Sequence, residues 1–460
     1  MSDIDSDGHF GNEDSRLSGR VRRIAQVGTQ VGGLAAQLAG ARVLGRELDR
    51  EKHSTNLKAA LGNLKGPLMK AAQILATIPD ALPSEYAEEL RQLQSNAPPM
   101  GWPFVKRRMR TELGPDWRGR FDSFGQEAAA AASLGQVHKA TLDGRILASK
   151  LQYPDMSSTV EADLGQLKLA FSVYRQYDRA IDTSDIYKEL SARLREELDY
   201  DREARHIALY RLMLAEEAGV EVPEPIMELT TQRLLTMTWL EGMPLLEFVG
   251  RHPDPELRNQ VALNMFRAWY RPFYYYGVIH GDPHLGNYTV RDDCRINLLD
   301  FGCIRVFPPS FVKGVIDLYH AIRDEDRDLA ISAYQAWGFA NVADQPDLLE
   351  VLNIWAKFIY APLLEDKSQP IMEGRGGAEG AATAAKVHKE LRRLGGVKPP
   401  REFVLMDRAA VGLGSVFLHL KAEINWYRLF HEMIGTFHVK DLAKRQKAAL
   451  KQVGLPEEIP

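Results

Sequence analysis

The fold of this chain is decided by the stretch His280-Gly281-Asp282-Pro283-His284-Leu285-Gly286-Asn287 and by the later stretch Leu299-Asp300-Phe301-Gly302. Asp282 and Asn287 are five positions apart (287 − 282 = 5), and Asp300 follows a short apolar run that ends at Leu299. Phosphoryl transfer requires a carboxylate near the incoming nucleophile, and Asn and Asp oxygens that hold Mg²⁺ against the phosphates. The order and spacing of these residues therefore predict a site for nucleotide chemistry.

The same spacing is found in protein kinases, where H-R-D is followed by four residues and Asn, and then by D-F-G. On this interpretation Asp282 is the base or water-positioning residue, and Asn287 and Asp300 bind Mg²⁺. One alternative is a turn-rich Gly/Pro loop without chemistry. Another is a metal pair formed by His280 and His284, but Pro283 disfavours the helical geometry that this pair would need.

A kinase fold also needs a lysine on a strand to contact the nucleotide phosphates. The pair Asp143-Gly144 predicts a hairpin turn, and the strand expected at residues 146–151 carries Lys150. We therefore expect Lys150 to hold the phosphates. The alternative is a solvated lysine at the edge of a sheet.

The loop before this hairpin departs from the usual kinase pattern. Where kinases have a Gly-rich loop, residues 128–132 are all alanine and Ser133 follows them. Glycine lets backbone N–H groups close on phosphates, whereas a methyl group at each position restricts that conformation and favours helix. We interpret the segment as an altered nucleotide loop in which Ala130, Ala131, Ala132 and Ser133 bind the nucleotide.

Together these motifs resemble the UbiB-type atypical kinases, the ubiquinone-biosynthesis kinase-like proteins. The resemblance extends from about residue 60 to beyond residue 300. The segments that carry it are Ala131–His138, Lys150–Pro154, Glu197–Tyr200, Arg202–Ala204, His280–Asn287 and Asp300–Gly302. The resemblance implies an α+β, protein-kinase-like fold of two lobes, with a small mixed N-lobe, a helical C-lobe and an N-terminal helical extension.

The family also carries a Lys-x-Gly-Gln segment ahead of the kinase core, and here the matching residues are Lys70-Ala71-Ala72-Gln73. The resemblance implies that Lys70 and Gln73 reach the nucleotide pocket. Ala72 stands where the family has Gly, which is a departure from the pattern. The alternative is that Lys70 and Gln73 share the polar face of an amphipathic helix, as residues three apart do.

The acidic partner of the lysine is expected in residues 184–214, which form a polar and apolar pattern at helical spacing. Glu196, Glu197 and Glu203 are all candidates within this region. The resemblance favours Glu197 as the residue that orients Lys150, and the other two stay open.

Composition excludes some classes of function. The chain has 460 residues, of which 45% are hydrophobic and 26% charged, so it can bury substantial cores. Its formal net charge of −4 gives no indication of a nucleic-acid partner, which usually requires a basic face. Two cysteines, Cys294 and Cys303, cannot form a disulfide framework, so we expect a reducing, cytoplasmic compartment.

Four segments follow from these patterns. We expect a disordered polar tail at residues 1–22 and the helical extension with its Lys-x-x-Gln motif at 23–105. The kinase-like N-lobe, with the Ala-rich loop and inserted helices, is expected at 106–243. The helical C-lobe, with the motifs that contain Asp282 and Asp300, is expected at 244–460. Residues 24–46 are rich in Ala and Gly but too polar to span a bilayer, so only peripheral membrane contact is considered.

The resemblance also implies a function and its ligands. It suggests an ATPase, or a lipid or small-molecule kinase, that binds ATP or ADP with Mg²⁺ and supports ubiquinone biosynthesis. Expected partners are a prenyl-phenol or quinone-pathway lipid, a membrane surface, and enzymes of ubiquinone biosynthesis. Two alternatives are kept: a small-molecule kinase of the aminoglycoside or choline kinase type, and a nucleotide-bound pseudokinase that acts as a scaffold.

Overall fold

Most of the kinase-like region is described by the structure, which is a computed structural model. Lys70, Gln73 and Ser133 lie outside the described residues, as does nearly all of the segment assigned to the N-terminal extension. The described residues are 100–132, 134–162, 164–165, 168, 183–339, 341–371, 382–383, 386–387, 389–391, 393–394 and 401–457.

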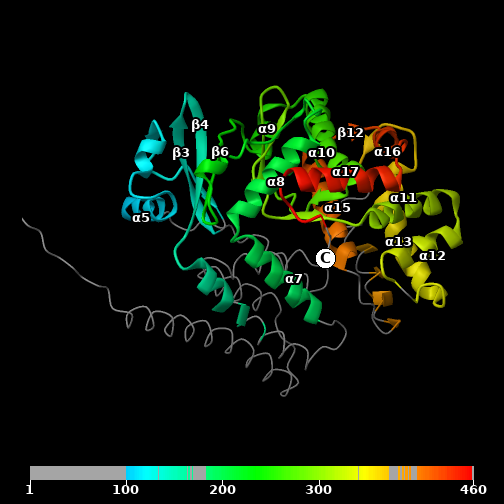
Figure 1. The fold of residues 1–460 in the computed structure, drawn as a ribbon. Helices are drawn as coiled ribbons and strands as arrows, with labels where there is room; N and C mark the ends of the chain where they lie inside the picture. The colour runs from blue at the N-terminus through cyan, green and yellow to red at the C-terminus, as the bar shows by residue number, and fades with distance from the viewer. Residues whose placement is uncertain are drawn as a thin grey trace, which may run out of the picture.

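An antiparallel five-stranded sheet forms the first part of the fold (Figure 1). Its strands follow the order β1-β3-β4-β6, and β2 pairs with β3. The expected hairpin between β3 and β4 is confirmed: Asp143 and Gly144 have φ of 50° and 72°, the left-handed conformations that a tight hairpin turn requires. The bounds are β1 Ser123–Phe124, β2 Ala130–Ala132, β3 Gly135–Leu142, β4 Arg145–Gln152 and β6 Leu234–Thr238.

Helix α5 (Trp102–Leu113) covers one face of this sheet. Val105, Met109 and Leu113 are spaced four residues apart, so they lie on one side of the helix, and all three are buried. They pack in one cluster with Leu147 and Leu151 of β4. Two short 3₁₀ helices, η1 (Trp117–Arg120) and η2 (Met227–Leu229), contribute further buried residues to the cluster.

Two helices occupy the region predicted as a helical pattern at residues 184–214. Helix α7 covers Thr183–Glu196 and α8 covers Tyr200–Met213. Asp199 begins the second helix as its N-cap, because its carboxylate accepts a hydrogen bond from the backbone N–H of Arg202 at 3.1 Å. This cap lies inside the predicted pattern and breaks it at residues 197–199.

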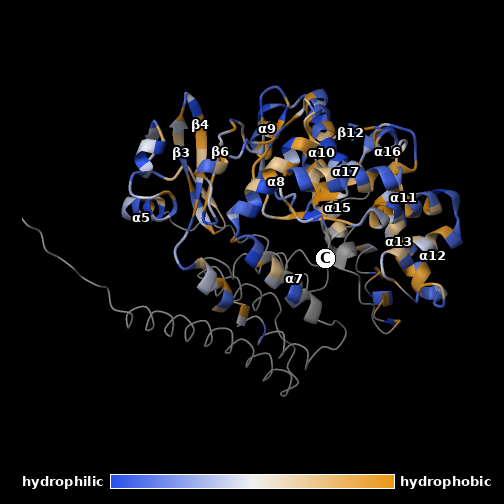
Figure 2. Ribbon diagram, in the orientation of Figure 1, coloured by the Kyte–Doolittle hydropathy of each residue, from blue (hydrophilic) through white to orange (hydrophobic). Residues whose placement is uncertain are grey.

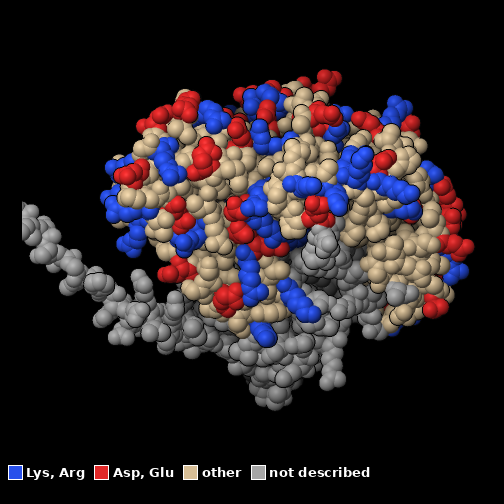
Figure 3. Space-filling model, in the orientation of Figure 1, with Lys and Arg blue, Asp and Glu red and all other residues tan. Residues whose placement is uncertain are grey.

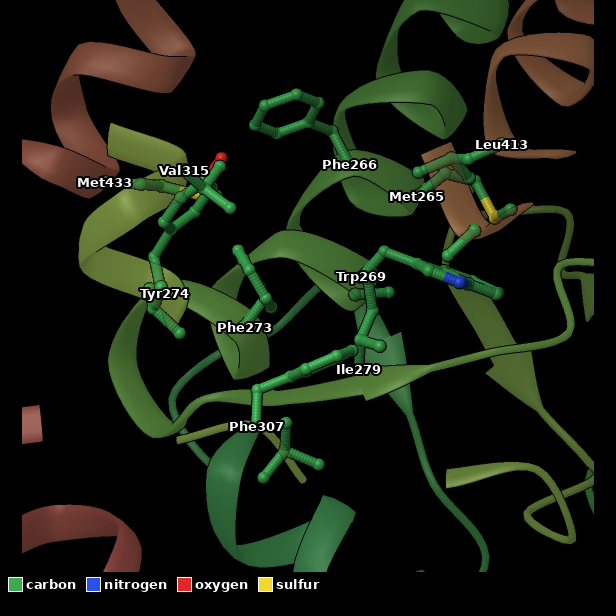
Figure 4. Packing of buried hydrophobic residues seen from close by; sticks show 14 of the residues in the cluster. Met265, Phe266, Trp269, Phe273, Tyr274, Ile279, Phe307, Val315, Leu413 and Met433 are labelled. Carbon is green, nitrogen blue, oxygen red and sulfur yellow. The ribbon is translucent and has the colours of Figure 1, made fainter. Parts of the chain in front are cut away.

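The centre of the helical part is α10 (Pro255–Tyr276). Met265, Trp269 and Phe273 follow each other at four-residue spacing and are completely buried or nearly so. Figure 4 shows these side chains packed with residues from β7 and α11. The helix ends at Gly277, which adopts φ of 65° as its C-cap, and strand β7 (Val278–His280) begins at the next residue. The end of α10 therefore fixes where the His280 motif starts.

Short strands and further helices complete the fold, and Figure 2 shows hydrophobic residues on the strands of the large sheet and along α15. Among the described helices, none has both the length and the apolar character needed to cross a bilayer. The short strands and single-turn helices are β5 Val220–Glu221, η3 Leu285–Asn287, β8 Tyr288–Val290, β9 Ile296–Leu298, β10 Ile304–Val306, η4 Ala361–Leu363, β11 Gln369–Pro370 and β12 Glu423–Ile424. The helices are α9 Leu245–Arg251, α11 Pro309–Asp324, α12 Arg327–Ala336, α13 Pro346–Tyr360, α15 Arg401–Leu420, α16 Trp426–Ile434 and α17 Val439–Gln452.

Charged side chains of both signs are interspersed over the face of the molecule seen in Figure 3. This agrees with the nearly balanced composition of 58 Lys and Arg against 62 Asp and Glu.

Candidate nucleotide site

Lys150 lies on β4 in the middle of the sheet, opposite Val137 of β3 and Leu235 of β6. Only 8% of the residue is exposed, so the strand lysine is not a solvated edge charge. Its Nζ donates to both carboxylate oxygens of Glu203, at 2.8 and 3.0 Å, and to Oδ2 of Asp300 at 3.4 Å. The ammonium group therefore lies between two carboxylates that come from distant parts of the chain.

The charge of Lys150 is stabilised by these neighbours. Burial alone would lower the pKa of Lys150, but the carboxylates of Glu203 and Asp300 outweigh it and raise the pKa well above its usual value. The ring of Tyr200 adds a cation–π contact, with its centroid 5.0 Å from Nζ. Lys150 is therefore protonated at neutral pH.

The partner of Lys150 is Glu203, which corrects the sequence-based preference for Glu197. The physical reason is the break between α7 and α8: Glu203 lies in the first turn of α8 and faces the sheet, whereas Glu197 precedes the cap of that helix. Glu196 forms ion pairs with Arg202 and Arg305 instead. Glu197 lies near the second motif, because a Cβ added to Gly302 would be 3.6 Å from its Cγ.

His280 joins the motif at residues 280–287 to the motif at residues 299–302. Its Nε2 donates to the backbone carbonyl of Asp300 at 2.6 Å, and its Nδ1 accepts from the backbone N–H of Asp282 at 3.2 Å. Trp269 of α10 donates to the carbonyl of His280 at 3.0 Å. The role of His280 is thus to position neighbouring backbone, and among the described residues no group of three or more His, Cys, Asp or Glu side chains has the arrangement of a metal site.

Asn287 is hydrogen-bonded to the backbone of Asp282 and to that of Leu299, the residue before Asp300. Its side-chain Nδ2 donates to the backbone carbonyl of Asp282 at 3.0 Å. Its backbone carbonyl accepts from the backbone N–H of Leu299 at 2.9 Å. The structure therefore brings Asp282, Asn287 and Asp300 to one region of the fold.

The side-chain chemistry of this region is suited to Mg²⁺. Asn287 and Asp300 offer the hard oxygen ligands that Mg²⁺ prefers, and the Asp300 side chain is 37% exposed, so it is accessible to a ligand. Mg²⁺ is commonly held by one or two protein oxygens together with substrate phosphates and water. When bound, the ion would neutralise charge on the phosphates.

The Ala-rich loop forms a strand at its end. Ala130, Ala131 and Ala132 make up β2 and pair antiparallel with Val137, Gln136 and Gly135 of β3. Ala130 and Ala131 are exposed, so their methyl groups are not part of a hydrophobic core. The segment is extended here, although a run of alanines alone favours helix.

Two residues near the site were not predicted to act there. Tyr200 was quoted only as part of a motif, but its ring contacts Lys150. His206 donates through Nδ1 to the carbonyl of Phe301 at 3.0 Å, and its spacing of three from Glu203 could have placed it on the same helix face.

Comparison with known protein families identifies the family to which the fold belongs. The model of the ABC1 atypical kinase-like domain matches residues 92–334, which is 243 of the 460 residues. This chain belongs to the ABC1 atypical kinase-like family. The kinase-like, mixed α and β fold expected from the motifs is thereby confirmed.

Several curated proteins of this family are similar to the chain. The mitochondrial atypical kinase coq-8 of Caenorhabditis elegans is 27% identical over 449 residues, which cover 92% of this chain and 58% of that protein. The mitochondrial atypical kinase COQ8 of Saccharomyces cerevisiae is 29% identical over 266 residues, which cover 57% of this chain and 53% of that protein. The chain therefore spans somewhat more than half the length of these two relatives.

A solved structure is also similar. The complex of Rv3197 with erythromycin from Mycobacterium tuberculosis superposes with a TM-score of 0.56 at 26% identity. The match covers 87% of this chain and 98% of that one.

Proposed function

We propose that the chain binds Mg-ATP beside Lys150 and either hydrolyses it or transfers its γ-phosphoryl group to a lipid or other small molecule. The observation that carries this proposal is the buried Lys150, held by Glu203 and Asp300 next to the loop of Asp282 and Asn287. Membership of an atypical kinase family supports it. The names of the COQ8 relatives are the reason to propose a role in ubiquinone, or another prenyl-quinone, metabolism.

Each side chain has a separate task in this proposal. Lys150 is protonated at neutral pH and would neutralise charge on the nucleotide phosphates, while Glu203 fixes its position. Asn287 and Asp300 would hold Mg²⁺. Asp282 would accept the proton of the attacking hydroxyl or orient a water molecule.

We further propose, from the family resemblance, that Lys70 and Gln73 approach the phosphates and that the extension covers the acceptor side of the site. Ala130, Ala131, Ala132 and Ser133 would contact the nucleotide. Such a cover would exclude peptide substrates and leave room for a lipid-like molecule. A membrane surface and enzymes of ubiquinone biosynthesis are the proposed partners, and contact with the membrane would be peripheral. We also propose a reducing, cytoplasmic location, on the basis of the two cysteines. The names of the COQ8 relatives place those proteins in mitochondria.

Nucleotide turnover by the purified full-length chain tests the proposal. We expect ATP hydrolysis that rises with prenyl-phenols in detergent or with anionic vesicles, and that is lost in Asp282→Asn. Asp292→Asn is the matched control, because Asp292 is an exposed aspartate in the turn between β8 and β9. Strong Asp282-dependent phosphorylation of peptide libraries without any lipid response would instead assign the chain to ordinary protein kinases.

A second candidate is suggested by the Mycobacterium tuberculosis structure, which is a complex of Rv3197 with erythromycin. In this candidate the phosphoryl acceptor is a bulky hydroxylated small molecule, as in the small-molecule kinase alternative. Incubation with Mg-ATP and erythromycin, followed by mass spectrometry of the macrolide, separates the two: a phosphorylated macrolide supports this candidate, and an unchanged one with lipid-stimulated hydrolysis supports the first. A scaffold without turnover would show no ATP hydrolysis in the first assay and no phosphorylated macrolide in the second.

A further inference from the structure

One carboxylate outside the proposed nucleotide site joins three parts of the chain. Glu196 is the last residue of α7, and its oxygens are 2.9 Å from Arg202 and 2.7 Å from Arg305. Arg202 lies in the first turn of α8, and Arg305 lies on β10, five positions after Asp300. The end of one helix, the start of the next and the strand after Asp300 therefore meet at Glu196.

The surroundings of this carboxylate differ from those of a surface ion pair. The side chain of Glu196 is 20% exposed and that of Arg305 is 9% exposed. In the neighbouring pair of Glu161 and Arg195, both side chains are more than half exposed. Exposed pairs usually contribute little to stability, whereas the loss of one partner from a buried pair leaves an uncompensated charge. Removal of Glu196 should therefore destabilise the structure around it, whereas removal of Glu161 should have little effect.

The parts joined by Glu196 carry residues of the nucleotide site. Arg202 immediately precedes Glu203, which holds Lys150. Helix α8 also reaches the second motif directly, because His206 donates to the carbonyl of Phe301 and Glu203 accepts from its backbone N–H at 3.4 Å. Glu196 adds a third connection, further along the strand, between α8 and the segment that follows Asp300.

Protein kinases often form connections of this kind only after modification. Phosphorylation of the loop after D-F-G supplies an anion that arginines bind, and this orders the loop and the helix beside it. In this chain two guanidinium groups, from α8 and from the strand after Asp300, surround a carboxylate of the chain itself. Burial alone would raise the pKa of Glu196, but Arg305 and Arg202 outweigh it and lower the pKa, so the carboxylate is ionised at neutral pH.

We propose that Glu196 is a positioning residue whose carboxylate holds α8 and β10 in register, so that Glu203 and Asp300 stay aligned on Lys150 without an added phosphate group. The part of this inference that concerns the nucleotide site rests on the proposed function. The part that concerns the restraint on β10 is independent of that function, and it can be measured without any nucleotide.

Cys303 provides that measurement, because it lies two positions before Arg305 and is partly exposed. The chain has one other cysteine, Cys294, which is 4% exposed and serves as an internal reference. We expect a thiol reagent to label Cys303 in Glu196→Gln about tenfold faster than in the wild type, since loss of a largely buried ion pair leaves the arginines uncompensated and makes local opening easier. Labelling of Cys294 should stay slow, and Glu161→Gln should behave as the wild type.

A second variant makes the test specific for the carboxylate. In Glu196→Ala the two arginines remain, so added acetate or formate should restore slow labelling of Cys303, and it should have no such effect in Glu196→Ala combined with Arg305→Gln. If Glu196→Ala does not fold, Arg202→Gln replaces it, and labelling between that of the wild type and Glu196→Gln is expected. Unchanged labelling of Cys303 in the folded Glu196 variants would overturn the proposal.

Nucleotide affinity then separates this proposal from the function on which it partly rests. If the wild type binds Mg-ADP, Glu196→Gln should bind it about tenfold more weakly, as expected when an ion pair that positions the site is lost. Equal affinity in both proteins would overturn the alignment role. A wild type that binds no Mg-ADP, with Cys303 still restrained by Glu196, would contradict the proposed function and leave the restraint supported.

Discussion

The chemistry of single residues in this protein depends on burial as much as on contact. Lys150 and Glu203 are both almost fully buried, so neither can exchange its partner for water. A buried ion pair adds little net stability, but removing one partner is strongly destabilising because the other charge remains. The identity of the glutamate that pairs with Lys150 can therefore be measured.

We predict that Glu203→Ala lowers the free energy of unfolding by about 3 kcal/mol, the lower end of the range for a broken buried pair, because Asp300 still compensates part of the Lys150 charge. Denaturant titration measures this. Combined with Lys150→Ala, the loss should be clearly less than the sum of the single losses. Glu197→Ala with Lys150→Ala should be nearly additive, and a larger coupling for Glu197 than for Glu203 would contradict the observed pairing.

His206 gives a prediction of pH dependence. Burial, together with the positive charge of Arg202, lowers its pKa from 6.5 to about 3, so it is neutral in the folded protein. The unfolded chain takes up a proton below about pH 6.5, so the stability contribution is complete above that pH and is lost as the pH falls towards 3. Between pH 6.5 and 5.5 the wild type should lose about 1 kcal/mol more than His206→Asn does. Parallel stability curves for the two proteins would show that His206 does not titrate in this way.

At the scale of elements, short-range patterns were predictable and interruptions were not. Asp143-Gly144 specified a hairpin turn because few residue pairs adopt its backbone angles, and the strand with Lys150 followed from it. The spacing of Asp282, Asn287 and Asp300 was visible because it lies within one short stretch of sequence. The break between α7 and α8 was missed because Asp199 reads equally well as a polar residue in a helix or as its cap.

Tertiary pairing explains the other differences. The alanines of β2 favour helix intrinsically, but pairing with β3 makes them extended, as long-range contacts often override local preference. Which glutamate meets Lys150 depends on the phase of α8, and that phase is set at its cap. Predicting the Lys150–Glu203 pair thus required the three-dimensional arrangement, whereas Lys150 itself could be identified from the sequence.

Gly135 lies where β3 and β4 approach each other most closely among the glycines of this hairpin. A Cβ added there would be 2.2 Å from the backbone oxygen of Leu151 and 3.1 Å from the hydroxyl of Tyr200, so the strands would have to move apart. We expect Gly135→Ala to destabilise the protein by about 3 kcal/mol, the upper range for forcing atoms into a packed interior. Gly119→Ala is the control, since its Cβ would meet no atom within 4 Å. Equal thermal unfolding of the two variants would mean that the hairpin can widen freely.

In the molecule as a whole, the proposed site lies where two packed units meet. One cluster of buried residues joins α5 to the outer face of the sheet, and a larger one surrounds α10. Lys150 comes from the sheet, Glu203 from a helix that packs on the larger cluster, and Asp300 from the segment between β9 and β10. A ligand that binds all three would connect the units and stabilise both.

Because the site joins the two units, nucleotide binding should be measurable as a gain in stability of the whole fold. A ligand that binds only the folded state stabilises it by RT ln(1 + [L]/Kd), which is about 2.7 kcal/mol at a concentration one hundred times Kd. We expect Mg-ADP to raise the midpoint of thermal unfolding in the wild type, and ADP with a chelator to raise it much less. Asp300→Asn keeps the size of the side chain but removes a charged oxygen ligand, so the difference between these two conditions should disappear. The exposed Asp292→Asn should keep the full difference, and an undiminished Mg²⁺ effect in Asp300→Asn would remove Asp300 from the proposed metal site.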